Sequence, residues 1–195
     1  MSLLRNRQSG YSLLELVITM AIIAILVTSL VNVTIGSARG YRYLQTQSDA
    51  SVDLSNTLNR VAKVVRGSTS VTEAQSNRLT VFAYFSPQDT VVKQITYFVD
   101  GSDLKATVIP PSGSGPNYTY NAADGKTYTL ARNLNGGGMV FSYFNDTGAQ
   151  LSGSFTTTQI KQVGITVIIN PNPKVLRKPM SAQTIVTLRN KKTNL

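Results

Sequence analysis

The pattern of hydrophobic and polar residues divides the chain into two contrasting parts. Residues 16–38 carry no charged side chain, and the stretch LVITMAIIAILVTSLV within them is almost wholly aliphatic. A helix of about 20 such residues spans the hydrocarbon core of a bilayer, because each residue adds about 1.5 Å. We therefore expect a membrane-spanning segment at about residues 13–38.

Residues 41–66 continue the helical pattern without a proline. Together with the apolar segment they predict one unbroken helix over residues 11–66, about 84 Å long. Its second half has one face suited to packing against a domain. The packing positions expected from the spacing are Leu44, Ser51, Ser55, Leu58, Ala62 and Val65, with Leu54 and Val61 beside them.

After Gly67 the period changes from that of a helix to that of β-strands. Short segments rich in β-branched and aromatic residues alternate with turn residues. Asp100-Gly101, Asp124-Gly125 and residues 145–148 lie between strand candidates, as hairpin loops do. The expected strands lie within residues 78–85, 92–99, 104–109, 127–131, 139–144, 153–159, 163–169 and 181–188.

These elements predict an α+β fold, in which a long N-terminal helix packs on an antiparallel β-sheet domain and crosses a membrane with its first half. The expected domains are a leader over residues 1–10, the helix over 11–66 and a globular β-rich domain over 67–195.

The residues that support most catalytic chemistry are missing from the 195-residue chain, which has no cysteine, no histidine and no tryptophan. This excludes thiol catalysis, disulfides, Ser-His-Asp triads and zinc sites of the usual kind. Gly136–Gly138 lack the lysine and helix start of a phosphate-binding loop, and they predict a flexible link. We expect no catalytic residue, no metal and no cofactor, and hence a protein that is not an enzyme.

Positive charge exceeds negative charge, with 19 Lys and Arg against 9 Asp and Glu, or a formal net charge of +10. Residues 67–173 are neutral as a whole, so much of the excess lies at the C-terminal end. Such a surplus suits an anionic partner, either DNA or a membrane surface. The candidate anion-binding residues are Lys174, Arg177, Lys178, Arg189, Lys191 and Lys192.

The cations of the helix allow two interpretations. Arg39 and Arg42 lie where the span leaves the bilayer, so contact with lipid headgroups is expected. Arg60, Lys63 and Arg66 fit a solvated helix face, with contact to headgroups or neighbouring subunits as the alternative.

Two further patterns also allow a plain and a functional interpretation. Aromatic and basic residues interleave at 41–43 and 118–132, which suits single-stranded DNA, although tyrosines in strands more often pack on the sheet. Asp100 with Asp103, or residues 145–146, offer clustered oxygens for calcium. Their spacing fits no known calcium loop, which favours plain turns.

Glu15 stands at the start of the apolar segment, where a carboxylate in hydrocarbon costs a few kcal/mol or more unless it is paired. No basic residue lies within one helical turn of it. Cleavage after Gly10 would free the amine of Tyr11, and in an array of helices this amine could pair with the Glu15 of a neighbour. Arg5 and Arg7 precede the span and should hold the N-terminus in the cytoplasm.

The segment RQSGYSLLEL, residues 7–16, resembles the class III leader of type IV pilins and type II secretion pseudopilins. The family pattern is a short basic leader ending in glycine, an aromatic residue or Met next, and glutamate at the fifth mature position. Gly10 and Glu15 match it, and Tyr11 is an aromatic residue at the position where phenylalanine is commoner. The resemblance implies cleavage after Gly10 by a prepilin peptidase, methylation of the Tyr11 amine, and assembly through Glu15.

The resemblance also implies partners and a location. The expected partners are other pilin or pseudopilin subunits, the prepilin peptidase, the inner-membrane assembly platform and membrane lipid. The precursor should cross the cytoplasmic membrane once with its N-terminus inside, and the mature subunit should then enter an extracellular or periplasmic filament at the cell surface.

The later segments ITYFVDGSDLKA, LARNL, MVFSYFNDTG and TIVTLRN are similar in order to the minor pseudopilins called J and the minor pilins called W. Asn32 occupies the place where many major pilins have a helix-bending proline. Both features favour a minor pilin or pseudopilin. The alternative is a DNA-binding minor pilin of a competence pilus.

Three other interpretations of the N-terminus stay open. The segment could be an ordinary single-pass anchor, the anchor of an adhesin without a filament, or a general secretory signal cleaved at Gly36-Ser37-Ala38. A mature chain that begins at Tyr11 supports the pilin interpretation, and one that begins at Arg39 contradicts it.

Overall fold

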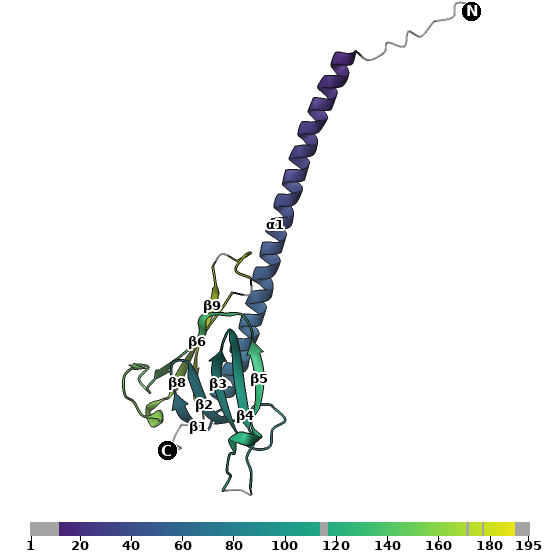
Figure 1. Cartoon of the computed structure of the whole chain (residues 1–195). Coiled ribbons are helices and arrows are strands. Elements are labelled where there is room, and N and C mark those ends of the chain that lie inside the picture. The colour runs from purple at the N-terminus through teal and green to yellow at the C-terminus, as the bar shows by residue number, and fades with distance from the viewer. Residues whose placement is uncertain (1–11, 114–116, 171, 177, 190–195) are drawn as a thin grey trace, which may run out of the picture. The chain divides into compact units, whose positions relative to one another are not determined.

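The computed structural model describes residues 12–113, 117–170, 172–176 and 178–189. Within these ranges one α-helix, α1 (Leu13–Arg66), precedes nine β-strands (Figure 1). This confirms the predicted α+β fold, a long N-terminal helix followed by antiparallel sheets. Contacts within the chain divide it into two units, Met1–Leu44 and Gln45–Leu195, so the unit boundary falls inside α1.

Both ends of α1 follow from local chemistry. Ser12 precedes the first helical residue, and its hydroxyl accepts a hydrogen bond from the Leu14 amide at 3.2 Å. Serine is a preferred residue at this position because it satisfies an amide that lacks a helical partner. The helix ends at Arg66, where the amide of Gly67 bonds to the carbonyl of Lys63 at 3.3 Å.

The larger sheet is an antiparallel meander of five strands in chain order, β1-β2-β3-β4-β5. Gly101 forms the turn between the third and fourth strands with φ of 60°, which confirms the hairpin expected at Asp100-Gly101. The bounds are β1 (Ser70–Ala74), β2 (Arg78–Ala83), β3 (Lys93–Asp100), β4 (Asp103–Ile109) and β5 (Lys126–Ala131).

The second sheet has four antiparallel strands in the order β7-β6-β8-β9. The turn between the first two in chain order ends at Gly148, with φ of 81°, as the sequence of residues 145–148 predicted. The bounds are β6 (Leu134–Phe144), β7 (Gln150–Leu151), β8 (Gln162–Ile169) and β9 (Met180–Thr187).

Two local predictions were wrong. Residues 153–159 form no strand but a loop that ends in the 3-10 helix η2 (Thr157–Gln159). Gly136–Gly138 are no flexible link, because they lie within β6, where a Cβ on Gly138 would clash with the carbonyl of Ile168. Asp124-Gly125 lies, as expected, in the connection between the antiparallel strands β4 and β5, where Asp124 ends the 3-10 helix η1 (Ala122–Asp124).

The core of the unit Gln45–Leu195 lies between the second part of α1 and both sheets. Buried helix side chains recur three or four residues apart, and Val61 and Val65 are fully buried among strand residues of both sheets. Ser51 and Ser55, expected at packing positions, are exposed instead, because Ala50 and Leu54 face the core.

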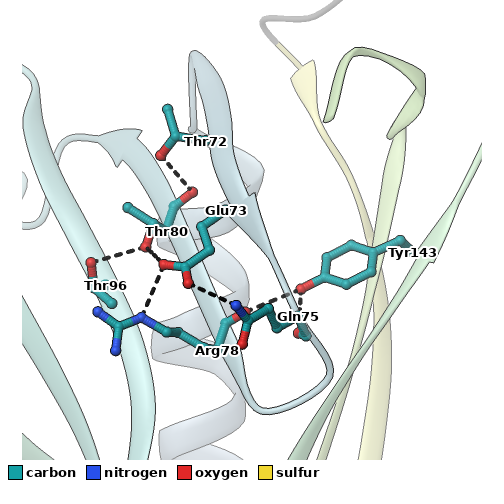
Figure 2. Close-up of polar contacts among 7 residues, drawn as sticks. All are labelled: Thr72, Glu73, Gln75, Arg78, Thr80, Thr96 and Tyr143. Atoms are coloured by element: carbon teal, nitrogen blue, oxygen red, sulfur yellow. Dashed lines mark hydrogen bonds and ion pairs between the residues drawn. The ribbon is translucent and has the colours of Figure 1, made fainter. Parts of the chain in front are cut away.

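A polar network joins the β1–β2 hairpin to the second sheet (Figure 2). The hydroxyl of Tyr143 in β6 donates to the carbonyl of Gln75 at 2.7 Å. Within the hairpin, the Glu73 carboxylate accepts hydrogen bonds from Arg78 Nε and from the Thr80 hydroxyl, both at 2.9 Å. The two sheets are therefore held together by hydrogen bonds as well as by apolar packing.

Candidate functional site

The first part of α1, residues 13–44, combines an apolar surface with satisfied polar groups. Its most apolar stretch of 18 residues has a mean hydropathy of 2.6, and none of it is buried. The hydroxyls of Thr19, Thr28 and Thr34 donate to carbonyls four residues earlier at 2.7–2.8 Å, so their polar atoms have partners inside the helix. These are the properties that a helix in hydrocarbon requires.

Glu15 is the acidic residue of the first turn of α1, and its side chain is exposed. Across the described ranges of the chain, no hydrogen bond or ion pair engages its carboxylate. Ser12 and Glu15 have the Ser-x-x-Glu spacing of a helix start, where the helix dipole favours an acid by about 0.3–1 kcal/mol. This dipole effect is smaller than the cost of an unpaired charge in hydrocarbon, so Glu15 still needs a partner.

The predicted processing residues Gly10 and Tyr11 lie outside the described residues, and so do three of the predicted anion-binding residues, Arg177, Lys191 and Lys192.

The other three C-terminal cations are exposed but lie apart. Lys174 and Lys178 belong to the connection between β8 and β9, whereas Arg189 follows β9 at its other end. A strand of eight residues measures roughly 26 Å. The structure therefore does not bring Lys178 and Arg189 together, and their anion-binding role stays a prediction.

The acidic turns have structural roles. Asp100 forms an ion pair with Lys105 at 2.6 Å, and Asn145 Oδ1 accepts hydrogen bonds from the amides of Thr147 and Ala149 within one turn. No group of three or more acidic, histidine or cysteine side chains that could hold a metal occurs within the described ranges.

Two of the hollows beside the second part of α1 share a lining residue, Arg60. The larger, about 630 Å³, is lined by Asp49, Asp53 and Arg60 of the helix and by residues 129–133 at the end of β5. The smaller, about 460 Å³, lies beside the last turns of the helix and the segment after β2. The side chain of Arg60 is exposed, as the interpretation of a solvated helix face expects.

Residues 118–132, where aromatic and basic residues interleave, contain two tyrosines that pack against other aromatic rings, as expected for tyrosines of a sheet. The ring of Tyr120 meets that of Phe82 edge-on at 4.8 Å, and its hydroxyl donates to the carbonyl of Val92. The ring of Tyr128 stacks on Phe85 at 5.3 Å.

The first part of α1 therefore has the length and composition of a membrane anchor, and it precedes antiparallel β-sheets in the chain. Residues 5–31 match the family described as the prokaryotic N-terminal methylation motif. The chain therefore carries a leader of the type IV pilin kind, and such a leader implies processing by a prepilin peptidase and assembly with other pilins. Curated protein sequences give no match to the chain.

Proposed function

We propose that the chain is a minor pilin or pseudopilin, a structural subunit of a type IV pilus or a type II secretion pseudopilus, matured by cleavage after Gly10. One observation carries this proposal. Glu15 has a carboxylate without a partner in the described part of the chain, at the start of a helix whose residues 16–38 are uncharged. In an ordinary membrane anchor the favourable effect of the helix dipole on an acid there is smaller than the cost of an unpaired charge in hydrocarbon.

The partner of Glu15 is the freed, methylated amine of Tyr11 on a neighbouring subunit. Opposite charges about 4 Å apart attract by about 4 kcal/mol at an effective dielectric constant of 20. Pairing also removes the cost of leaving either charge alone among aliphatic side chains. Recruitment of a subunit and the register of its helix then depend on the same contact.

The proposed route starts from a precursor that crosses the cytoplasmic membrane once with its N-terminus inside. After cleavage and methylation, the assembly platform moves the subunit from the bilayer into the filament, which is extracellular or periplasmic. Along this route the apolar surface of residues 13–38 exchanges contact with lipid for contact with other subunits.

A minor subunit, similar to the J and W kinds, is proposed because α1 has Asn32 where many major pilins have proline. The order of the later segments supports this kind. In the chain, the antiparallel strands β3 and β4 on either side of Gly101 come before β6 and β8, and β9 is the last strand.

The alternative prediction, a DNA-binding minor pilin, drew on the C-terminal cations. Lys178 and Arg189 lie at opposite ends of β9 and so make no common groove for a phosphate backbone. The assembly role therefore has the better support from these residues.

Glu15→Gln tests the assembly role, because it removes the charge and keeps the size of the side chain. We expect the variant to be cleaved and held in the membrane, with its amount in the sheared filament fraction at least about tenfold lower. Asp53→Asn is the control, since it neutralises another exposed acid of α1 beyond the span. Normal incorporation of the Glu15→Gln subunit would refute the pairing.

A further inference from the structure

The smaller hollow beside the last turns of α1 has an unusual lining. It measures about 460 Å³ and is formed by the helix on one side and by the segment that follows β2 on the other. The residues that matter for its chemistry are Arg60, Lys63, Tyr84, Phe85 and Pro87.

The helix side of the hollow is positively charged. Arg60 and Lys63 lie three residues apart and hence on one face of α1. The guanidinium carbon of Arg60 is 5.2 Å from the centroid of the Phe85 ring, a cation–π contact that holds it at the wall. Across the described residues neither cation forms an ion pair, and no acidic residue is among those that line the hollow.

The acid of the adjoining loop, Asp89, already has partners within that loop and in β3. Its carboxylate accepts hydrogen bonds from the amides of Phe85 and Ser86, both at 2.9 Å, and from Lys93 Nζ at 2.6 Å. Burial raises the pKa of Asp89, but these hydrogen bonds and the charge of Lys93 outweigh it, so that the pKa lies below its ordinary value. Asp89 therefore fixes the wall of the hollow without cancelling the charge of Arg60 and Lys63.

The other wall offers aromatic surface. Tyr84 is 46 % exposed and lines the hollow, while the half-buried ring of Phe85 is braced by stacking on Tyr128. A ligand that is only an anion would be bound by the cations and would not need an aromatic ring. Cations beside an exposed aromatic ring are the combination that binds the phosphate and the base of a nucleotide together.

We propose that this hollow binds single-stranded nucleic acid, with a base stacked on Tyr84 and the adjoining phosphates held by Lys63 and Arg60. Stacking accepts every base, so binding should show little sequence preference. Affinity should fall as salt rises, because phosphate contacts release counterions.

The test uses the full chain in nanodiscs of phosphatidylcholine, which carry no net charge. A fluorescent oligothymidylate of about twelve nucleotides is titrated by anisotropy at about 50 mM and about 200 mM salt. We expect binding that weakens with salt. Tyr84→Ala and Lys63→Gln should each weaken it at least about fivefold, and Tyr84→Phe, which keeps the ring, should bind like the unaltered chain.

Matched controls locate the site. Tyr118→Ala removes a tyrosine of similar exposure, 41 % against 46 %, and should leave binding unchanged. Arg189→Gln removes a C-terminal cation and should also have little effect. An abasic oligonucleotide of equal length, which offers phosphates alone, should bind at least about fivefold more weakly than oligothymidylate.

Four results would each overturn the proposal. These are no binding at low salt, equal binding of the abasic strand, equal effects of Tyr84→Ala and Tyr118→Ala, and a loss caused by Arg189→Gln but not by Lys63→Gln. The abasic arm needs no variant, so the proposal stays open to refutation even if a substitution unfolds the protein. Nanodiscs contain no filament, so these results do not depend on the assembly role of Glu15.

Discussion

Glu15 and Asp89 show how the surroundings of a single carboxylate decide its role. Glu15 stands out in the sequence, because an unpaired carboxylate at the start of a long aliphatic segment costs free energy in hydrocarbon. Asp89 does not stand out. Its role depends on two amides and on Lys93, which the folded loop brings to it.

Asp89→Asn should lower the free energy of unfolding at neutral pH by about 1–3 kcal/mol, because a charged acceptor of three hydrogen bonds is lost. The pKa of Asp89 is depressed in the folded state, so this stability is present above the ordinary pKa of about 3.8. It is lost as the pH falls through the folded-state pKa. Denaturant unfolding of the full chain in neutral detergent, measured between neutral pH and about pH 3, checks both points.

The control for this prediction is Asp124→Asn, which changes an exposed aspartate at the end of η1. It should leave the unfolding curve nearly unchanged at every pH. A gap between the Asp89→Asn variant and the unaltered chain that stays constant down to pH 3 would show that Asp89 contributes no pH-dependent stability.

Among the strands, two buried tyrosines differ in what their hydroxyls contact. Burial raises the pKa of Tyr143 and of Tyr97 far above the ordinary range, so both hydroxyls stay protonated. Tyr143 donates across the sheets to Gln75, whereas the hydroxyl of Tyr97 has no partner among the described residues.

Replacement of each tyrosine by phenylalanine isolates this difference. Tyr143→Phe should destabilise the protein by about 1 kcal/mol or more, because the Gln75 carbonyl loses its donor. Tyr97→Phe should be neutral or stabilising, because it removes a polar group that burial penalises. Thermal unfolding of the two variants side by side measures the contrast, and an equal loss in both would contradict the proposed link between the sheets.

The element predictions succeeded where a regular period dominates and failed where side chains or neighbours override it. Residues 153–159 are rich in threonine and suggested a strand, yet the Gln159 side chain accepts a hydrogen bond from the Thr156 amide and favours a turn. Gly138 was expected in a flexible link, but it lies in β6, where the carbonyl of Ile168 leaves no room for a Cβ. The Thr156-x-x-Gln159 spacing is a capping signature that the sequence displays, whereas the lack of room at Gly138 depends on the fold.

For the whole molecule, the N-terminal features were predictable and the hollow beside α1 was not. Glu15 and the apolar span lie within one continuous helix, so their spacing in the sequence is also their spacing on α1. Lys63 and Tyr84 are separated in the chain by a helix end and two strands, and only the fold brings them to the two sides of one hollow. The excess of cations near the C-terminus predicted anion binding there instead.

The central claim is that the chain matures as a pilin-type subunit, and the N-terminus of the mature chain tests it most directly. Intact mass and N-terminal sequencing of the chain extracted from membranes should show a start at Tyr11 with one methyl group on its amine. A start at Arg39 would identify a general secretory signal, and an uncleaved leader would identify a plain anchor. Either of these results would contradict the account.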